Sequence, residues 1–457
     1  MIAQIKRVLS VPELKEKITF TLLMLIICRI GAFITAPGVN GDEAVKMFRF
    51  ASGGGQNLFQ LVDIFSGGAF AQMTVIALGV MPYITASIVM QILMAIVPSL
   101  QRDMKENPEV GKRKMGKWIR ILTLGIAVFQ SGVFARYAVQ LNISHPGIVV
   151  RELLDITMFG YPVLFIVLVI VTMTSGTLLL MWIGEQITER GVGNGISLII
   201  SLGILSSLPG VIGTLIRNLN LDSQEAGQLT FSSLLLVAAI FVAIIAGTIL
   251  IIQAQRKIPL QYARRPVAGR TTDSTGAYIP LKVNYAGVIP VIFASSILMF
   301  PATIGQFLGG SSWIGKISNY IVPGTWTYTL LYVSLIFFFT YFWTATQFRP
   351  DQIASDMKKN GAFIPGIRQG LPTQEYLEST MNRITFAGAT FLALIAVLPT
   401  LVSRFLHLDA SISYFFGGTS LLILVGVILD TTKQIESHLL MKRYDGFMKT
   451  GRITGRT

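Results

Sequence analysis

Charged residues are what this 457-residue sequence has least of, at 13% of the chain, whereas about 25% is usual in soluble proteins. Cysteine occurs once, as Cys28, which excludes an intrachain disulfide and a cysteine-ligated metal cluster. The three histidines lie far apart in the sequence, so they do not indicate a metal site either. We therefore expect neither a metal nor a cofactor. The scarcity of charge, together with 52% hydrophobic residues, predicts a membrane protein.

The common catalytic motifs are also missing. There is no Walker-type phosphate loop, no HExxH and no GxSxG. Residues 191–195, GVGNG, are rich in glycine, but they stand between two apolar runs and no strand precedes them, which argues against a dinucleotide site. The sequence predicts that the chain has no enzymatic activity of its own.

Long apolar runs are what the sequence has instead, and a helix needs about 20 such residues to cross a bilayer. Helices suit these runs because backbone polar groups in lipid must be satisfied within the segment. The ten predicted spans are 19–36, 73–97, 117–139, 158–183, 196–216, 230–252, 286–305, 327–346, 385–402 and 410–429. The predicted fold class is therefore an all-α polytopic membrane protein.

The positive charges predict the orientation, because lysine and arginine gather in cytosolic loops. If the N-terminus is cytosolic, 29 of the 37 lysine and arginine residues fall in cytosolic segments. An even number of spans puts both termini on the same side, and both ends of the chain are basic. We expect a cytosolic N-terminal segment (1–18) and a cytosolic tail (430–457).

Two cytosolic loops, 253–285 and 347–384, are long and basic. In the first, apolar and aromatic residues flank a Gly/Thr/Ser-rich middle, which suggests a hairpin-like finger, although a solvated linker is also consistent with it. The second contains the turn-rich sequence GAFIPGIRQG (361–370), which carries Arg368. Positive-inside topology alone would explain most of the charges in these loops.

The second and seventh spans share a short pattern. Residues 79–88 read GVMPYITASI and residues 287–297 read GVIPVIFASSI. Because the two spans are five apart, they would cross the membrane in opposite senses, as in an inverted repeat, although chance similarity remains an alternative. Just before the second span, residues 57–72 are apolar but too short to cross, so we expect them to fold back into the membrane interior. Arg29 is the strongest charge within a span, and we interpret it as a structural arginine that pairs with a partner helix or snorkels.

Five segments together resemble the SecY/Sec61-alpha family, the channel-forming subunits of the Sec protein translocon. They are 81–91, MPYITASIVMQ; 180–197, LMWIGEQITERGVGNGIS; 287–304, GVIPVIFASSILMFPATI; 361–370, GAFIPGIRQG; and 416–423, FGGTSLLI. The resemblance runs in the same order from the first span to the tail. It implies two inverted five-helix halves, 19–217 and 218–429, that are hinged between the fifth and sixth spans and form an hourglass pore with a plug helix.

The resemblance also implies roles for individual residues. The pore ring would consist of Val80, Ile84, Ile200, Ile292 and Ile423. The plug would occupy 57–72, with Leu58, Phe59, Leu61, Val62, Ile64, Phe65, Gly67, Gly68 and Phe70. A lateral gate between spans 2–3 and 7–8 would include Thr85, Gln91 and Phe300, and the docking positions would be Arg368, Arg264 and Arg265. Without the resemblance, the ring aliphatics would pass for ordinary core or lipid-facing residues, and the small polar residues of the seam for packing positions.

The function that follows is a protein-conducting channel in the bacterial plasma (inner) membrane. It would translocate unfolded secretory precursors and release signal or transmembrane segments laterally into the bilayer. The implied partners are SecE and SecG subunits, the SecA motor ATPase, the ribosome, the signal peptides of precursors and bilayer lipid. A ten-span secondary transporter of a small solute is the alternative, and it would need mid-span coupling residues that are not evident beyond Arg29.

Overall fold

The computed structural model describes residues 11–52, 58–144, 146–155, 162–217, 231–262, 277–307, 321, 325–405, 415 and 418–450. Within these residues, each of the ten predicted spans overlaps one long helix. The long helices are α2 (Pro12–Gly31), α5 (Met81–Ile96), α7 (Pro108–Ser144), α9 (Val163–Arg190), α10 (Gly195–Arg217), α11 (Phe231–Gln253), α12 (Ile289–Phe307), α14 (Trp326–Gln347), α16 (Leu371–Phe405) and α18 (Gly418–Thr450). Shorter helices are α3 (Gly41–Ser52), α4 (Leu58–Ser66), α6 (Pro98–Glu106), α8 (Arg151–Leu154) and α15 (Pro350–Lys359).

Six helices of the described chain are long and apolar enough to cross a membrane, and they are α7, α9, α10, α11, α14 and α16. Two further apolar helices, α5 and the first part of α12, are shorter. Many large apolar side chains of these eight helices, such as Val242 and Leu250 on α11, are exposed on the outside of the bundle. A multi-pass membrane protein accounts for these exposed apolar surfaces, because lipid covers them.

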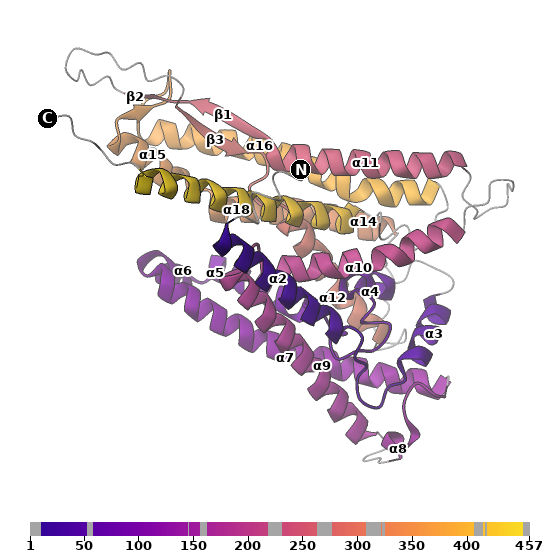
Figure 1. Ribbon diagram of the computed structural model, residues 1–457. Helices are drawn as coiled ribbons and strands as arrows, with labels where there is room; N and C mark the ends of the chain where they lie inside the picture. The colour runs from indigo at the N-terminus through magenta and orange to yellow at the C-terminus, as the bar shows by residue number, and fades with distance from the viewer. Residues whose placement is uncertain are drawn as a thin grey trace, which may run out of the picture.

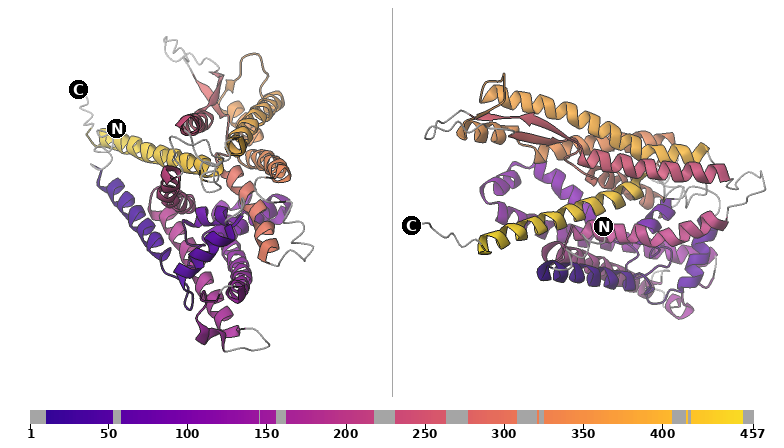
Figure 2. Two further views of the ribbon diagram at one scale, coloured as in Figure 1. Left: turned by 90° about the vertical axis from the view of Figure 1, so that its right-hand side faces the viewer. Right: turned by 45° about the horizontal axis from the view of Figure 1, so that its top comes forward.

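The long helices form two groups that meet along two seams (Figures 1 and 2). One group contains α2, α5, α7, α9 and α10, and the other contains α11, α12, α14, α16 and α18, as their mutual contacts show. On one side, α12 contacts α5 and α7; this is the front seam. On the other side, α10 contacts α18; this is the back seam. The short helix α4 contacts α10 and α12, so it lies between the two groups.

The second predicted span differs from the structure at its start. The helix begins at Met81, with Pro82 in its first turn, rather than at residue 73. Residues 67–80 instead form consecutive turns, and Val75 N–H donates to the Ile34 carbonyl at 2.9 Å. Most of these turn residues are buried, including Ala69, Thr74 and Ala77 at 0% exposure. Irregular backbone at membrane depth is tolerated when protein covers it, which is the arrangement here.

The backbone supports the internal repeat. Gly79 and Gly287 hold the same place in the two copies of the pattern, and each has a φ of +59°, in the left-handed region that favours glycine. Each glycine is followed two residues later by the first residue of a helix, α5 or α12. Ile84 and Ile292 then occupy equivalent positions, five residues after the glycine. Shared sequence and shared backbone conformation make coincidence a poor explanation.

The two long loops that the sequence predicts to be cytosolic form small antiparallel sheets. Strand β1 (Gln255–Pro259) pairs with β3 (Tyr278–Lys282), which confirms the pairing predicted for the finger. Strand β2 (Gln261–Tyr262) pairs with β4 (Ala362–Phe363), so the two long loops join each other. Buried residues of both loops and of α16, including Ile258, Leu281 and Leu377, form a core of their own beneath these strands.

Candidate functional site

Four of the five predicted ring residues line one cavity between the two helix groups. Val80, Ile84, Ile200 and Ile292 surround it together with three residues of α4, Val62, Phe65 and Ser66. The fifth, Ile423 on α18, is fully buried in the same apolar cluster but does not line the cavity. The structure therefore brings together positions that are up to 212 residues apart in sequence.

The backbone explains why these aliphatic side chains point at one another. Val80 directly precedes α5, and Ile84 follows one turn later, with its N–H donating to the Val80 carbonyl at 3.0 Å. Ile292 on α12 repeats this arrangement, because its N–H donates at 3.2 Å to the carbonyl of Val288, the residue before the helix. Since α5 and α12 both begin beside the cavity, their first turns present aliphatic side chains to it from opposite groups.

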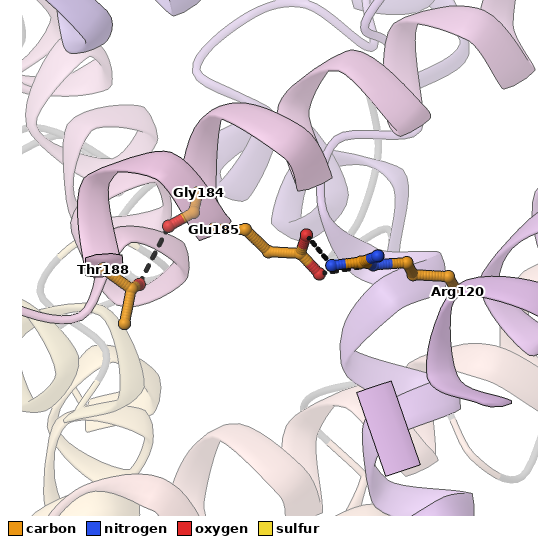
Figure 3. A network of polar contacts seen from close by, with 4 residues as sticks. All are labelled: Arg120, Gly184, Glu185 and Thr188. Carbon is orange, nitrogen blue, oxygen red and sulfur yellow. Dashed lines mark hydrogen bonds and ion pairs between the residues drawn. The ribbon is translucent and has the colours of Figure 1, made fainter. Parts of the chain in front are cut away.

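The position of Ile200 depends on how the start of α10 packs against the end of α9. The Thr188 hydroxyl at the end of α9 donates to the Gly184 carbonyl at 2.8 Å and accepts from Gly195 N–H at 2.9 Å. A Cβ atom at Gly195 would collide with the Gly184 carbonyl, so the glycine permits the close approach of the two helices. Figure 3 shows Thr188 and Gly184 on α9, next to the ion pair of Glu185 with Arg120 of α7. That pair is bidentate, with N···O distances of 2.7 and 3.1 Å.

The predicted plug is helix α4 followed by the turns of residues 67–72. Val62, Ile64 and Phe70 are buried, while Phe65 is half-buried. Gly67 and Gly68 have φ values of +69° and +89°, which allow the chain to reverse after Ser66. The side chains of Leu58, Phe59 and Leu61 lie outside the described residues.

The segment after α4 is held by its own polar groups. Ala71 N–H donates to Asp63 Oδ1 at 2.8 Å, and Gly68 N–H donates to the Asp63 carbonyl at 2.9 Å. The Ser66 hydroxyl donates to the Asp63 carbonyl and accepts from Phe70 N–H, both at 3.0 Å. Residues 63–71 therefore form one tightly turned unit that is continuous with the helix.

Two of the three predicted gate residues lie at the front seam. Thr85 and Phe300 line a second cavity with Met299 and Ser296 of α12, Gln130 and Val133 of α7, and Val62, Phe70, Leu78 and Met81. This cavity shares Val62, Leu78, Met81 and Ser296 with the ring cavity, so the front seam and the ring are adjacent. Gln91 lines neither cavity; its amide donates to Ser87 Oγ at 3.0 Å, further along α5.

Of the three predicted docking residues, Arg368 lies within the described part of the chain. Arg368 is exposed in the turn between β4 and α16. The turn is fixed by Gln369, whose amide donates to the Ala362 carbonyl at 3.1 Å, and by Thr373, whose hydroxyl donates to the Arg368 carbonyl at 2.7 Å. Arg264 and Arg265 lie outside the described residues.

Sequence reasoning missed several residues of the site. Leu78, Met81 and Met299 line the cavities without having been singled out. Met81 falls within the repeated pattern, which was the signal that could have found it. The contact of Arg29 with the plug was missed too, because a contact between residues 29 and 67 leaves no trace in local sequence.

Comparisons with known proteins agree on one family. Residues 74–432 match the SecY family. The protein translocase subunit SecY of Chlamydia trachomatis is 58% identical over 455 residues, covering 99% of this chain and 100% of that protein. A solved structure described as a protein-conducting channel superposes with a TM-score of 0.62 at 18% identity, covering 97% of this chain and 95% of that one. Sec61 in a canine ribosome–channel complex gives a TM-score of 0.58 at 17% identity, covering 97% and 95%.

Proposed function

This chain belongs to the SecY family and forms a protein-conducting channel, and from that premise we propose how its residues conduct, seal and release a translocating chain. The observation that carries the proposal is the ring cavity, where Val80, Ile84, Ile200 and Ile292 of both helix groups meet the plug. A multi-pass membrane protein with this site is a conduit rather than a catalyst. We place it in the bacterial plasma membrane with both termini in the cytosol, because the lysine and arginine distribution favours that orientation.

Translocating chains pass through the ring of aliphatic side chains. A moving polypeptide presents every kind of side chain as well as unpaired backbone groups. Valine and isoleucine side chains have no hydrogen-bonding atoms, so the ring holds no sequence tightly. Ile423 supports the ring from behind in the closed state, since it is buried in the same cluster without lining the cavity.

The plug seals the outer side of the ring. Val62, Phe65 and Ser66 of α4 line the ring cavity together with the four aliphatic residues. An incoming chain must displace α4, and the compact turn of residues 63–71 lets the plug leave as one unit.

Signal segments leave through the front seam, where α12 faces α5 and α7. A signal peptide carries an apolar stretch of about 7–15 residues, and it gains free energy when it reaches lipid. Each buried CH₂ contributes about 0.8 kcal/mol, so a few leucines suffice to favour an open seam. Thr85, Ser296 and Phe300 line the path that such a segment would take.

The cytosolic loops provide the docking face for the driving partner. We assign Arg368, Arg264 and Arg265 to contacts with the SecA motor or the ribosome, with SecE and SecG as membrane subunits. The exposed guanidinium of Arg368 stands on a rigid turn, and positive charge suits both ribosomal RNA phosphates and acidic protein surfaces. Energy comes from these partners, so the chain needs no enzymatic activity.

The secondary-transporter alternative is not favoured. Ion coupling usually places acidic residues within spans. Helices α5, α10, α11, α12 and α14 contain no aspartate or glutamate over the bounds given above. A permeation path lined by aliphatic residues suits an unfolded polypeptide better than a small polar solute.

Crosslinking to a stalled secretory precursor tests the proposed path. A photoreactive amino acid at position 84 or 292 should crosslink strongly to the precursor, because both side chains line the ring cavity. The matched control is position 93, since Leu93 lies on the same helix as Ile84 but is 45% exposed on the bundle surface. Equal crosslinking at positions 84 and 93, or none at 84 and 292, would contradict the proposal.

A further inference from the structure

Arg29 lies in the last turn of α2, and the proposed conduction path gives this charged side chain no role. It is half-buried, and its Nη1 donates a hydrogen bond of 2.7 Å to the carbonyl of Gly67, directly after the last residue of α4. The guanidinium carbon also lies 4.8 Å from the ring centroid of Phe33, two residues beyond the end of α2. An arginine that sequence alone assigns to a partner helix or to snorkelling therefore binds the end of the plug.

The charge of Arg29 suits the place that it contacts. The last carbonyl groups of a helix have no partners within the helix and carry partial negative charge, which a cation stabilises. A hydrogen bond from a charged donor is also shorter and stronger than one between neutral groups. The guanidinium thus meets a fixed partial negative charge, and Phe33 shields it on the other side by a cation–π contact.

The plug is closely packed against α10 at this end. Gly67 is buried, and a Cβ atom there would come within 2.5 Å of Ser206 Oγ and 3.0 Å of Arg29 Nη1. A Cβ atom at Gly203 of α10 would collide with the Phe65 carbonyl. The C-terminal turn of the plug therefore rests directly on the backbone of α10, with Arg29 on its other side.

The hydrogen bond from Arg29 to Gly67 restrains the whole plug. Because Asp63 and Ser66 tie residues 63–71 into one unit, a bond to Gly67 resists displacement of α4 as well. A cavity lined by Arg29, Phe65, Ser66, Val80 and Ser206, among others, lies against the ring cavity, with which it shares Phe65, Ser66, Gly79 and Val80. The bond must therefore break when the ring opens.

We propose that Arg29 is the latch of the closed channel: a positioning residue on α2 that holds the plug by a charged hydrogen bond to the Gly67 carbonyl. This inference rests on the proposed function of α4 as a plug. The latch sets the balance between the closed and the open plug, independently of the motor and of the signal sequence.

Ion conductance in planar bilayers tests the latch with four full-length channels. They are the unaltered chain, Arg29→Met, a chain in which residues 58–70 are replaced by a Gly/Ser linker, and the combination of both changes. Arg29→Met should raise the frequency of leak openings about tenfold, which is the size expected for loss of a hydrogen bond to a charged group. In the chain without the plug, the same substitution should add nothing. Lys15→Met is the matched control, because Lys15 is an exposed charge on the same helix.

Each other outcome overturns the latch. If Arg29→Met does not raise the leak, or raises it equally with and without the plug, Arg29 acts only on helix packing. If replacing residues 58–70 has no effect by itself, the plug assignment fails and the latch fails with it, so the two failures are distinguishable. Arg29→Lys keeps the charge on a shorter, unforked side chain and should restore part of the seal.

A second variant approaches the contact from the plug. Gly67→Ala adds a Cβ atom against Ser206 Oγ and Arg29 Nη1 at a φ of +69°, and it leaves α2 unchanged. It should produce the same leak as Arg29→Met, and the two substitutions together should not be additive. A sealed Gly67→Ala channel would overturn the latch even if Arg29→Met failed to accumulate in the membrane.

Discussion

The front and back seams join the same two groups of helices in different ways. At the front seam, the Ser296 hydroxyl on α12 approaches Met81 Sδ on α5 at 4.0 Å, a contact to a weak acceptor, and a cavity lies alongside. At the back seam, Gly193 N–H donates to Gln434 Oε1 of α18 at 2.9 Å.

The loop between α9 and α10 explains why the back seam is firmer. Val192 N–H donates to the Thr21 hydroxyl of α2 at 3.0 Å, while the next residue is bonded to α18. A Cβ atom at Gly193 would lie 3.0 Å from Thr431 Oγ1, so the loop and α18 are in close contact. We propose that the halves part at the front seam and turn about the back seam, because the described contacts of the loop bridge only the back seam. The hinge expected between the fifth and sixth spans, at 218–230, lies outside the described residues.

The largest stability effect should follow loss of the Thr21 hydroxyl. Thr21→Val keeps the shape of the side chain but leaves the buried Val192 N–H without its acceptor. We expect a loss of about 2 kcal/mol in unfolding free energy, the usual cost of an unsatisfied buried donor. Thr172→Val is the matched control, since the Thr172 hydroxyl donates to two carbonyls of its own helix, at 2.8 and 3.2 Å. Thermal unfolding in nanodiscs measures the stability of both variants. Equal losses of unfolding free energy would contradict a special role for the hydrogen bond between Thr21 and Val192.

Gln434→Ala should have the next largest effect. It removes the acceptor of Gly193 N–H across the back seam, and we expect a cost of about 1 kcal/mol because Gln434 is exposed and water can partly replace it. Gln434→Glu keeps an acceptor and should cost less. If Gln434→Ala is as stable as the unaltered chain, the back seam does not depend on this bond.

The ion pair of Arg120 with Glu185 joins two helices of the same half. It should contribute less to stability than either hydrogen bond of the loop between α9 and α10. Exposed pairs contribute little, and even this bidentate geometry should couple by about 0.5 kcal/mol. A double-mutant cycle with Arg120→Ala and Glu185→Ala measures the coupling. A coupling several times larger would place the stabilising polar contacts inside the half rather than at the back seam.

Ser296→Ala should have the smallest effect on stability. A contact of 4.0 Å to a thioether is weak, so we expect a change below about 0.5 kcal/mol in the same unfolding assay. A loss as large as that of Gln434→Ala would remove the difference between the seams on which the account depends.

Much of this architecture could be predicted from sequence because its causes are local. Apolar runs of sufficient length predicted ten helices, and the repeated Gly-Val-x-Pro pattern predicted equivalent places for Ile84 and Ile292. The start of α5 was predicted eight residues too early, because the turns of residues 73–80 are as apolar as a helix and only contacts with Ile34 reveal them.

The rest depends on pairings between distant segments, which carry no local signal. Pairing of β2 with β4 joins loops a hundred residues apart, and nothing in either loop indicated the other. Ile423 and Gln91 matched family motifs, yet in the structure Ile423 does not line the ring cavity and Gln91 does not line the gate cavity. Motif matching locates a residue on a helix, but the packing of neighbouring helices decides which cavity it faces.

The most direct test fixes each seam in turn with a short thiol crosslinker in a Cys28→Ala background. Met81→Cys with Ser296→Cys spans the front seam, and Leu198→Cys with Thr431→Cys spans the back seam, where both native side chains lie within 3.1 Å of the Gly193 Cβ position. Crosslinking the front pair should stop precursor transport, whereas crosslinking the back pair should leave most of it intact. Transport that continues through a fixed front seam, or that stops when the back seam alone is fixed, would contradict the account.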